Sequence, residues 1–230
     1  VAKFQDEPYG GLPTLGMAKV HQTARAEGVT VLLDGNGMDE AWAGYDYYHK
    51  AVSVNYSQGP VQGSRSPSTR PDCLIPEFAS AAVPLKASCP FGDPLRDLQY
   101  RDIRYAKIPR AMRFADRVSM MYSRELREPF LDHRLVELGL RQPAERKLRD
   151  GVGKWLPRRI AERLLPSDVR EAPKRPVQTP QREWLRGPLA CWADECIELA
   201  LAQFGGIWLD PIKTRHAWRE YRERSVDNRF

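Results

Sequence analysis

The sequence predicts an α/β protein that is predominantly helical after one obvious strand. Three observations carry this prediction. Residues 29–33, VTVLL, form a short, β-branched apolar run, which is typical of a strand buried on both faces of a parallel sheet. A glycine-containing turn joins that run to a helix. Most of the chain after residue 94 shows apolar residues at helical spacing.

The elements follow in order along the chain. We expect helices over residues 12–27 and 38–50 on either side of the strand. Residues 53–94 are rich in Pro, Gly and Ser, which predicts an exposed, flexible insertion. A helix is expected over residues 95–122, where Pro109 starts a new helix or kinks the old one. Further helices are expected over residues 132–141, 154–164, 183–202 and 210–224.

The turn after the strand is the strongest functional signal. It consists of Asp34, Gly35, Asn36 and Gly37, and its two glycines let backbone N–H groups approach a ligand without a Cβ in the way. The carboxyl end of a strand in a parallel sheet is also where ligands usually bind. The turn therefore favours a phosphate site, with an ordinary glycine turn as the alternative.

Two acids follow at the start of the next helix. Asp39 and Glu40 are paired carboxylates of the kind that hold a divalent cation beside phosphate. The alternative is that both only cap the helix, because acids are favoured in a first turn.

Three blocks of sequence resemble one family in the same order. Residues 29–45 (VTVLLDGNGMDEAWAGY), 116–136 (DRVSMMYSRELREPFLDHRLV) and 172–189 (APKRPVQTPQREWLRGPL) are similar to segments of the ATP-using synthetase domain of glutamine-dependent asparagine synthetases. The resemblance covers nearly the whole chain and is weakest over residues 53–94. It implies part of an adenine nucleotide alpha hydrolase-like (PP-loop ATP pyrophosphatase) domain.

The resemblance also implies a reaction and its cofactors. ATP, with Mg2+, activates the side-chain carboxylate of aspartate as an acyl-adenylate, and ammonia derived from glutamine displaces AMP. By the same resemblance Asp34, Gly35 and Gly37 bind the nucleotide, and Asp39 holds the Mg2+-pyrophosphate, with Glu40 a weaker candidate.

The chain departs from the family pattern at position 36. Asn36 stands where these enzymes carry a glutamate used in forming and aminating the adenylate. An amide can orient a ligand but cannot act as a carboxylate base. Either the proton is taken elsewhere or the substrate is not aspartate. Asp34, in place of the usual serine, adds a negative charge near phosphate unless its side chain points away or binds metal.

A lysine in the third block completes the predicted site. Lys174 matches the lysine of the family's Arg-Pro-Lys-Lys loop, where an ammonium stabilises charge on the pyrophosphate and the adenylate. Its rivals are Arg175 and Lys154. Residues 176–180, PVQTP, lack the family's glycines, which predicts a stiffer loop that could read a different acceptor.

Charged residues of the second block have two interpretations. Arg117, Arg127 and Asp132 either form buried ion pairs that brace helices around the site, which we favour, or contact substrate directly.

We expect the chain to be the carboxyl-terminal part of a longer protein. Residues 1–52 would end the nucleotide-binding layer, 53–94 form the insertion, and 95–230 complete the site with helices. The family's glutaminase domain and pyrophosphate loop are not found in the chain, so we expect it to be inactive alone and to work beside a glutaminase domain in its parent protein.

Composition agrees with a soluble enzyme. The formal net charge is +6, but acids are interleaved among the arginines, which argues against a nucleic-acid surface. No apolar run approaches the ~20 residues that span a bilayer, so we expect a cytoplasmic protein without membrane contact. The oligomeric state, a homodimer included, stays open.

The sequence therefore predicts an ATP-dependent, amide-forming synthetase. The first alternative is a relative that amidates another carboxylate, such as a sugar acid in polysaccharide synthesis, which Asn36 and the PVQTP loop favour. The second is a helical, non-catalytic interaction module derived from such an enzyme, against which the retained Asp39 and Lys174 argue.

Overall fold

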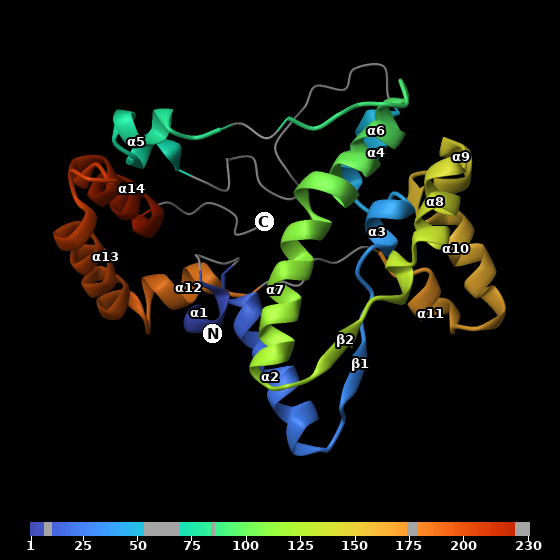
Figure 1. Cartoon of the computed structure of the whole chain (residues 1–230), viewed down its shortest axis with the longest axis horizontal. Coiled ribbons are helices and arrows are strands. Elements are labelled where there is room, and N and C mark those ends of the chain that lie inside the picture. The colour runs from blue at the N-terminus through green and yellow to red at the C-terminus, as the bar shows by residue number, and fades with distance from the viewer. Residues whose placement is uncertain (7–10, 53–69, 84–85, 174–178, 224–230) are drawn as a thin grey trace. The chain divides into compact units, whose positions relative to one another are not determined.

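The computed structural model describes residues 1–6, 11–52, 70–83, 86–173 and 179–223 (Figure 1). The chain divides into two compact units, residues 1–62 with 86–177 and residues 63–85 with 178–230. Much of the predicted insertion, namely residues 53–69 and 84–85, lies outside the described residues, as does Lys174. In the described ranges no helix has both the length and the apolar character needed to cross a bilayer.

The first unit contains a parallel strand pair flanked by helices (Figure 1). Strand β1 pairs with β2 in parallel, with Leu33 opposite Arg127. Helix α2 contacts helix α7 beside this pair. The elements up to the second strand are α1 (Ala2–Gln5), α2 (Pro13–Ala26), β1 (Val31–Leu33), α3 (Met38–Ala41), α4 (Asp46–Ala51), α6 (Pro94–Arg101), the π-helical turn η2 (Asp102–Ala106), α7 (Ile108–Met121) and β2 (Glu125–Arg127).

The rest of the first unit is a run of short helices and one small antiparallel strand pair. In chain order its elements are the 3-10 turn η3 (Pro129–Leu131), α8 (His133–Arg141), α9 (Ala144–Lys147), β3 (Leu148–Arg149), β4 (Val152–Gly153), α10 (Trp155–Ile160), the 3-10 turn η4 (Ala161–Arg163) and α11 (Ser167–Arg170).

The second unit is helical. Its elements are the 3-10 turn η1 (Pro71–Cys73), α5 (Pro76–Ser80), α12 (Gln181–Arg186), α13 (Ala190–Phe204) and α14 (Pro211–Glu223). The backbone N–H of Ile75 donates to Trp208 O at 3.0 Å, and that of Asp210 donates to Cys73 O at 2.8 Å. These bonds tie residues 73–75 to the turn between α13 and α14.

The structure confirms most expected helices and corrects four details. Strand β1 is not buried on both faces, since Leu33 is 72% exposed. Among the described residues β1 pairs only with β2, so its second edge has no strand beside it. The helix expected over residues 38–50 breaks into α3 and α4, and that over 183–202 breaks at Gly187, just before Pro188, which has no N–H to donate. Strand β2 was not expected.

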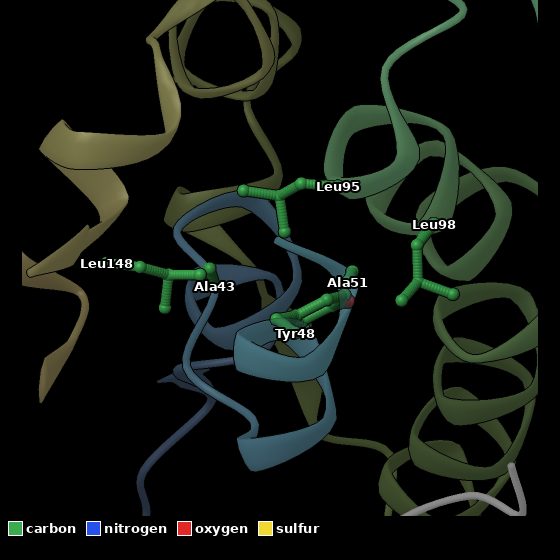
Figure 2. Packing of buried hydrophobic residues seen from close by; sticks show 6 residues of the cluster. All are labelled: Ala43, Tyr48, Ala51, Leu95, Leu98 and Leu148. Atoms are coloured by element: carbon green, nitrogen blue, oxygen red, sulfur yellow. The ribbon is translucent and has the colours of Figure 1, made fainter. Parts of the chain in front are cut away.

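The core of the first unit packs around α4 (Figure 2). Tyr48 and Ala43 are fully buried, and Leu98 from α6 and Leu148 from β3 pack into the same cluster. Apolar burial of this kind stabilises the fold by ~25 cal/mol per Å2 of apolar surface. The cluster fixes α4 against α6 and thereby anchors the chain that follows α3.

Candidate functional site

The site lies at the carboxyl edge of the two parallel strands. Asp34 directly follows β1 and Glu128 directly follows β2. The backbone N–H of Asp34 donates to Arg127 O at 2.9 Å, which continues the ladder one residue beyond the strands. Because parallel strands end at the same edge, the two following turns meet there.

The turn from Asp34 to Gly37 is held by its own side chains. The Asp34 carboxylate accepts from Gly35 N at 2.6 Å through Oδ1 and from Asn36 Nδ2 at 2.8 Å through Oδ2. Asp34 therefore folds back on the turn, and the Gly35 N–H donates to it. Gly37 has a φ of 94°, and a Cβ there would lie 2.2 Å from Leu131 Cδ2, so this position requires glycine.

Asn36 links the two strand ends. Its Nδ2 also donates to Glu128 Oε1 at 3.1 Å. Burial raises the pKa of the half-buried Glu128 carboxyl, the charge of Asp34 raises it further, and the hydrogen bonds from Asn36 oppose this. Glu128 Oε2 is buried and has no hydrogen-bond partner among the described residues. The sequence does not mark Glu128 as a site residue, because the three-residue run before it, Glu125 to Arg127, carries no strand pattern of its own.

Asp39 forms an ion pair with one of the predicted rivals of Lys174. Its Oδ1 lies 2.8 Å from Lys154 Nζ, and the two side chains are 18% and 22% exposed. Gly44 makes room for this carboxylate, because a Cβ at Gly44 would lie 1.9 Å from Asp39 Oδ1. The site thus brings a carboxylate and an ammonium group together where water reaches both side chains only in part.

The break between α3 and α4 positions this pair. Ala43 has a φ of 55°, in the left-handed region, and Gly44 N donates to Asp39 O at 2.8 Å. Lys154 also has a φ of 55°, and its backbone N–H donates to Trp42 O at 3.0 Å. Left-handed backbone costs a non-glycine residue about 1 kcal/mol or more. Tertiary contacts therefore hold both turns in place.

Glu40 faces the core. Its side chain is 4% exposed, and its Oε1 accepts from Tyr45 Oη at 2.7 Å. Gln99 Nε2 donates to the backbone oxygens of Glu40 and Ala41, each at 2.8 Å. In this arrangement Glu40 braces α3.

A buried polar cluster lies behind these acids. Lys107 Nζ is 3.5 Å from the centroid of the Tyr45 ring, and burial lowers the Lys107 pKa to about 8. Asp102 in η2 accepts from Tyr47 Oη at 2.5 Å and from Tyr48 Oη at 2.8 Å. A π-helical turn such as η2 often marks a functional region.

Other charged residues of the second block form exposed or half-exposed ion pairs rather than the buried ones we favoured. Arg127 pairs with Glu125 at 2.6 Å, and Arg117 pairs with Asp6. Asp132 caps α8 through Arg134 N at 2.9 Å. Arg127 ends β2 and Asp132 precedes α8, and both side chains reach solvent there.

The described residues fit a magnesium ion only in a limited way. They contain no group of three or more His, Cys, Asp or Glu side chains that could hold a metal. Mg2+ in nucleotide sites usually takes one or two carboxylates and otherwise water and phosphate. Asp39 fits that role, whereas Glu40 is engaged with Tyr45.

Comparison with known proteins identifies the family of the chain. The family described as Asparagine synthase matches residues 1–229. The chain belongs to the asparagine synthase family. The resemblance inferred from the three sequence blocks is thereby confirmed, and this family is a member of the adenine nucleotide alpha hydrolase-like superfamily.

Several relatives in this family are glutamine-hydrolysing asparagine synthetases. Asparagine synthetase 1 of Bacillus subtilis (strain 168) is 26% identical over an alignment of 239 positions, which covers 84% of this chain and 37% of the relative. A putative asparagine synthetase of Mycobacterium tuberculosis (strain ATCC 25618 / H37Rv) is 27% identical over an alignment of 234 positions, which covers 83% of this chain and 36% of the relative. The Gallus gallus enzyme is 29% identical over 165 residues, covering 70% and 22%. The chain therefore spans less than two fifths of the length of these relatives.

Proposed function

We propose that the protein containing this chain makes an amide by ATP-dependent activation of a carboxylic acid, with aspartate as the acid, β-aspartyl-AMP as the intermediate and ammonia from glutamine as the nitrogen donor. The observation that carries the proposal is the ion pair of Asp39 with Lys154, beside the strand edge that carries Asp34, Asn36 and Glu128. Membership of the asparagine synthase family supports the same reaction class.

The side chains divide the work by charge. Adenylation breaks the bond between the α- and β-phosphates of ATP, so negative charge grows on the departing pyrophosphate. Lys154 and, outside the described residues, Lys174 supply cations that stabilise this charge. Asp39 would hold Mg2+, which when bound neutralises phosphate charge. Gly37 lets the turn keep its left-handed backbone against Leu131, and this turn would lie beside the nucleotide.

The fold and the partners follow from the same proposal. We expect β1 and β2 to be part of the larger sheet of a PP-loop ATP pyrophosphatase domain, and a glutaminase domain in the parent protein to supply the ammonia. Cytoplasmic location and a homodimer are consistent with this enzyme class and stay predictions.

A second candidate is amidation of another carboxylic acid, for example a sugar acid. The observation in its favour is that Asn36 bonds to Asp34 and Glu128, an arrangement that differs from the single glutamate of the family pattern. A change of this kind next to the reacting carboxyl can alter which acid is accepted.

The test is ATP-pyrophosphate exchange by the complete protein with Mg2+, using aspartate and a panel of other carboxylic acids. We expect exchange with aspartate, and a loss of roughly 10²-fold or more in Asp39→Asn. Asp46→Asn is the matched control, since Asp46 is an exposed acid at the start of the next helix and should leave exchange unchanged. Exchange only with another acid would transfer the proposal to the second candidate. No exchange with any acid would contradict both and favour a non-catalytic interaction module.

A further inference from the structure

Position 36 and position 128 have to be considered together. The family pattern places a carboxylate at position 36, and this chain has an amide there. The amide nitrogen of Asn36 donates to Glu128 Oε1 at 3.1 Å, although the two residues are 92 positions apart in the sequence. The parallel register of β1 and β2 creates this contact, because it places the residues after Leu33 and Arg127 at one edge. A carboxylate is therefore present at the strand edge, but on the other strand.

Asp34 also places a carboxylate at this strand edge, but its hydrogen bonds leave it less able than Glu128 to accept a proton from a ligand. Both of its oxygens accept hydrogen bonds within its own turn, from Gly35 N and from Asn36 Nδ2. Glu128 differs, because only Oε1 accepts from Asn36, whereas the buried Oε2 has no partner among the described residues. A buried carboxylate oxygen without a hydrogen-bond partner lowers the stability of the fold, so its presence calls for a functional explanation.

The surroundings of Glu128 suit a proton acceptor. Burial raises the pKa of its carboxyl, and the charge of Asp34 acts in the same direction. Asn36 opposes both effects by hydrogen bonding to the carboxylate form. A carboxylate with a raised pKa accepts a proton more readily near neutral pH than an ordinary surface glutamate.

We propose that Glu128 is a catalytic residue that takes the proton from the amine during amide formation, and that Asn36 positions it. This inference rests on the proposed function. The nitrogen lone pair attacks the acyl carbon, the C–N bond forms, and the C–O bond to the AMP phosphate breaks. AMP leaves with that electron pair, and the proton from nitrogen goes to Glu128 Oε2. Glu128 thus supplies the carboxylate that position 36 lacks.

The experiment separates the two half-reactions of the complete protein. ATP-pyrophosphate exchange reports adenylation, and single-turnover amide formation with ammonium chloride reports the second step. Glu128→Gln preserves an oxygen that can accept from Asn36 but removes the base. We expect exchange within about 3-fold of the unaltered protein and amide formation reduced by about 10²-fold or more. Glu125→Gln is the matched control, because Glu125 is an exposed acid on the same strand, paired with Arg127.

Two further variants test position and titration. Asn36→Glu combined with Glu128→Gln moves the carboxylate across the contact, and we expect it to recover at least about 10-fold of the lost amide formation. Asn36→Ala removes the side-chain hydrogen bond that lowers the Glu128 pKa, so the acidic limb of the pH profile for amide formation should move to higher pH. The charged neighbour acting on Glu128 is Asp34, which both variants retain.

The outcomes are distinct. Unchanged amide formation in Glu128→Gln overturns this inference and leaves the proposed function intact. An equal loss of both half-reactions in a folded variant also overturns it, because a structural role would act on both. If Glu128→Gln does not fold, an acidic limb that stays in place in Asn36→Ala overturns it. Absence of exchange in the unaltered protein with every acid overturns the proposed function and this inference together.

Discussion

The two units of the chain carry their charges in different ways. In the first unit, Asp102 is buried and accepts from two tyrosine hydroxyls and from Arg101. In the second, Asp194 also accepts from an aromatic donor, Trp218 Nε1 at 2.7 Å, and from Arg222 at 3.0 Å, but both charged side chains are exposed. The two clusters contain similar chemical groups, but the first is shielded from water and the second is exposed to it.

The difference shows where a function is to be sought. Burying charged groups costs free energy unless every partner is in place, so a protein keeps such a network chiefly where it positions something. In the first unit this network lies behind Asp39 and Glu40. In the second unit the described side chains pack as aromatic stacks, such as Phe204 on Trp208 at 4.5 Å, with ion pairs in solvent.

The largest expected effect comes from cutting the buried network. Asp102→Ala leaves the hydroxyls of Tyr47 and Tyr48 and the Arg101 guanidinium without this acceptor, and should lower the free energy of unfolding by about 3–5 kcal/mol. Asp194→Ala removes a similar set of bonds in solvent and should cost about 1 kcal/mol or less. Urea unfolding of the complete protein, followed by tryptophan fluorescence, measures both. Equal losses in the two variants would contradict the comparison.

The pH dependence of stability gives a second, smaller effect. Burial lowers the pKa of Lys107 to about 8 and that of Lys147 to about 8. The unfolded chain holds these protons up to about pH 10, so between pH 8 and 10 it binds more protons than the folded chain and the free energy of unfolding rises with pH. Above pH 10 unfolded tyrosines ionise, whereas burial raises the pKa of Tyr47 and Tyr48 and keeps them protonated. Stability should therefore be greatest near pH 10.

Substitution assigns this rise to the lysines. Lys107→Met should remove about half of the increase between pH 8 and 10, because Lys147 retains the other part. Urea unfolding at a series of pH values provides the measurement. A rise of the same size in Lys107→Met would show that the lysine does not titrate as its burial implies.

The smallest effect is expected in the second unit. Arg215 and Glu198 lie 2.6 Å apart, but both side chains are exposed. Solvent and salt screen such a pair, so a double-mutant cycle with Arg215→Ala and Glu198→Ala should give a coupling free energy close to zero at physiological salt. A large, salt-independent coupling free energy would contradict the view that the charge pairs of the second unit are weakened by solvent.

Local patterns account for what was predicted correctly. Helix α2 was expected over residues 12–27 and spans Pro13–Ala26, and α14 was expected over 210–224 and spans Pro211–Glu223. Both have apolar spacing and end signals that neighbouring residues carry. The glycines after β1 also predicted the turn there. The structure explains Gly37, because its left-handed backbone and the close approach of Leu131 both require glycine. Family membership followed from three motifs in order.

Contacts distant in sequence account for what was not predicted. The sequence alone determined most of the helices, the strand β1, the acids after it and the family. Only the tertiary structure decided that Glu128 meets Asn36, that Lys154 meets Asp39 and that Glu40 turns into the core. The reason is that β2 is three residues long, too short to show a period of its own, and becomes a strand only by pairing with β1. Likewise, the break at Ala43 arises because Lys154 N–H captures the Trp42 carbonyl, a partner more than a hundred residues away.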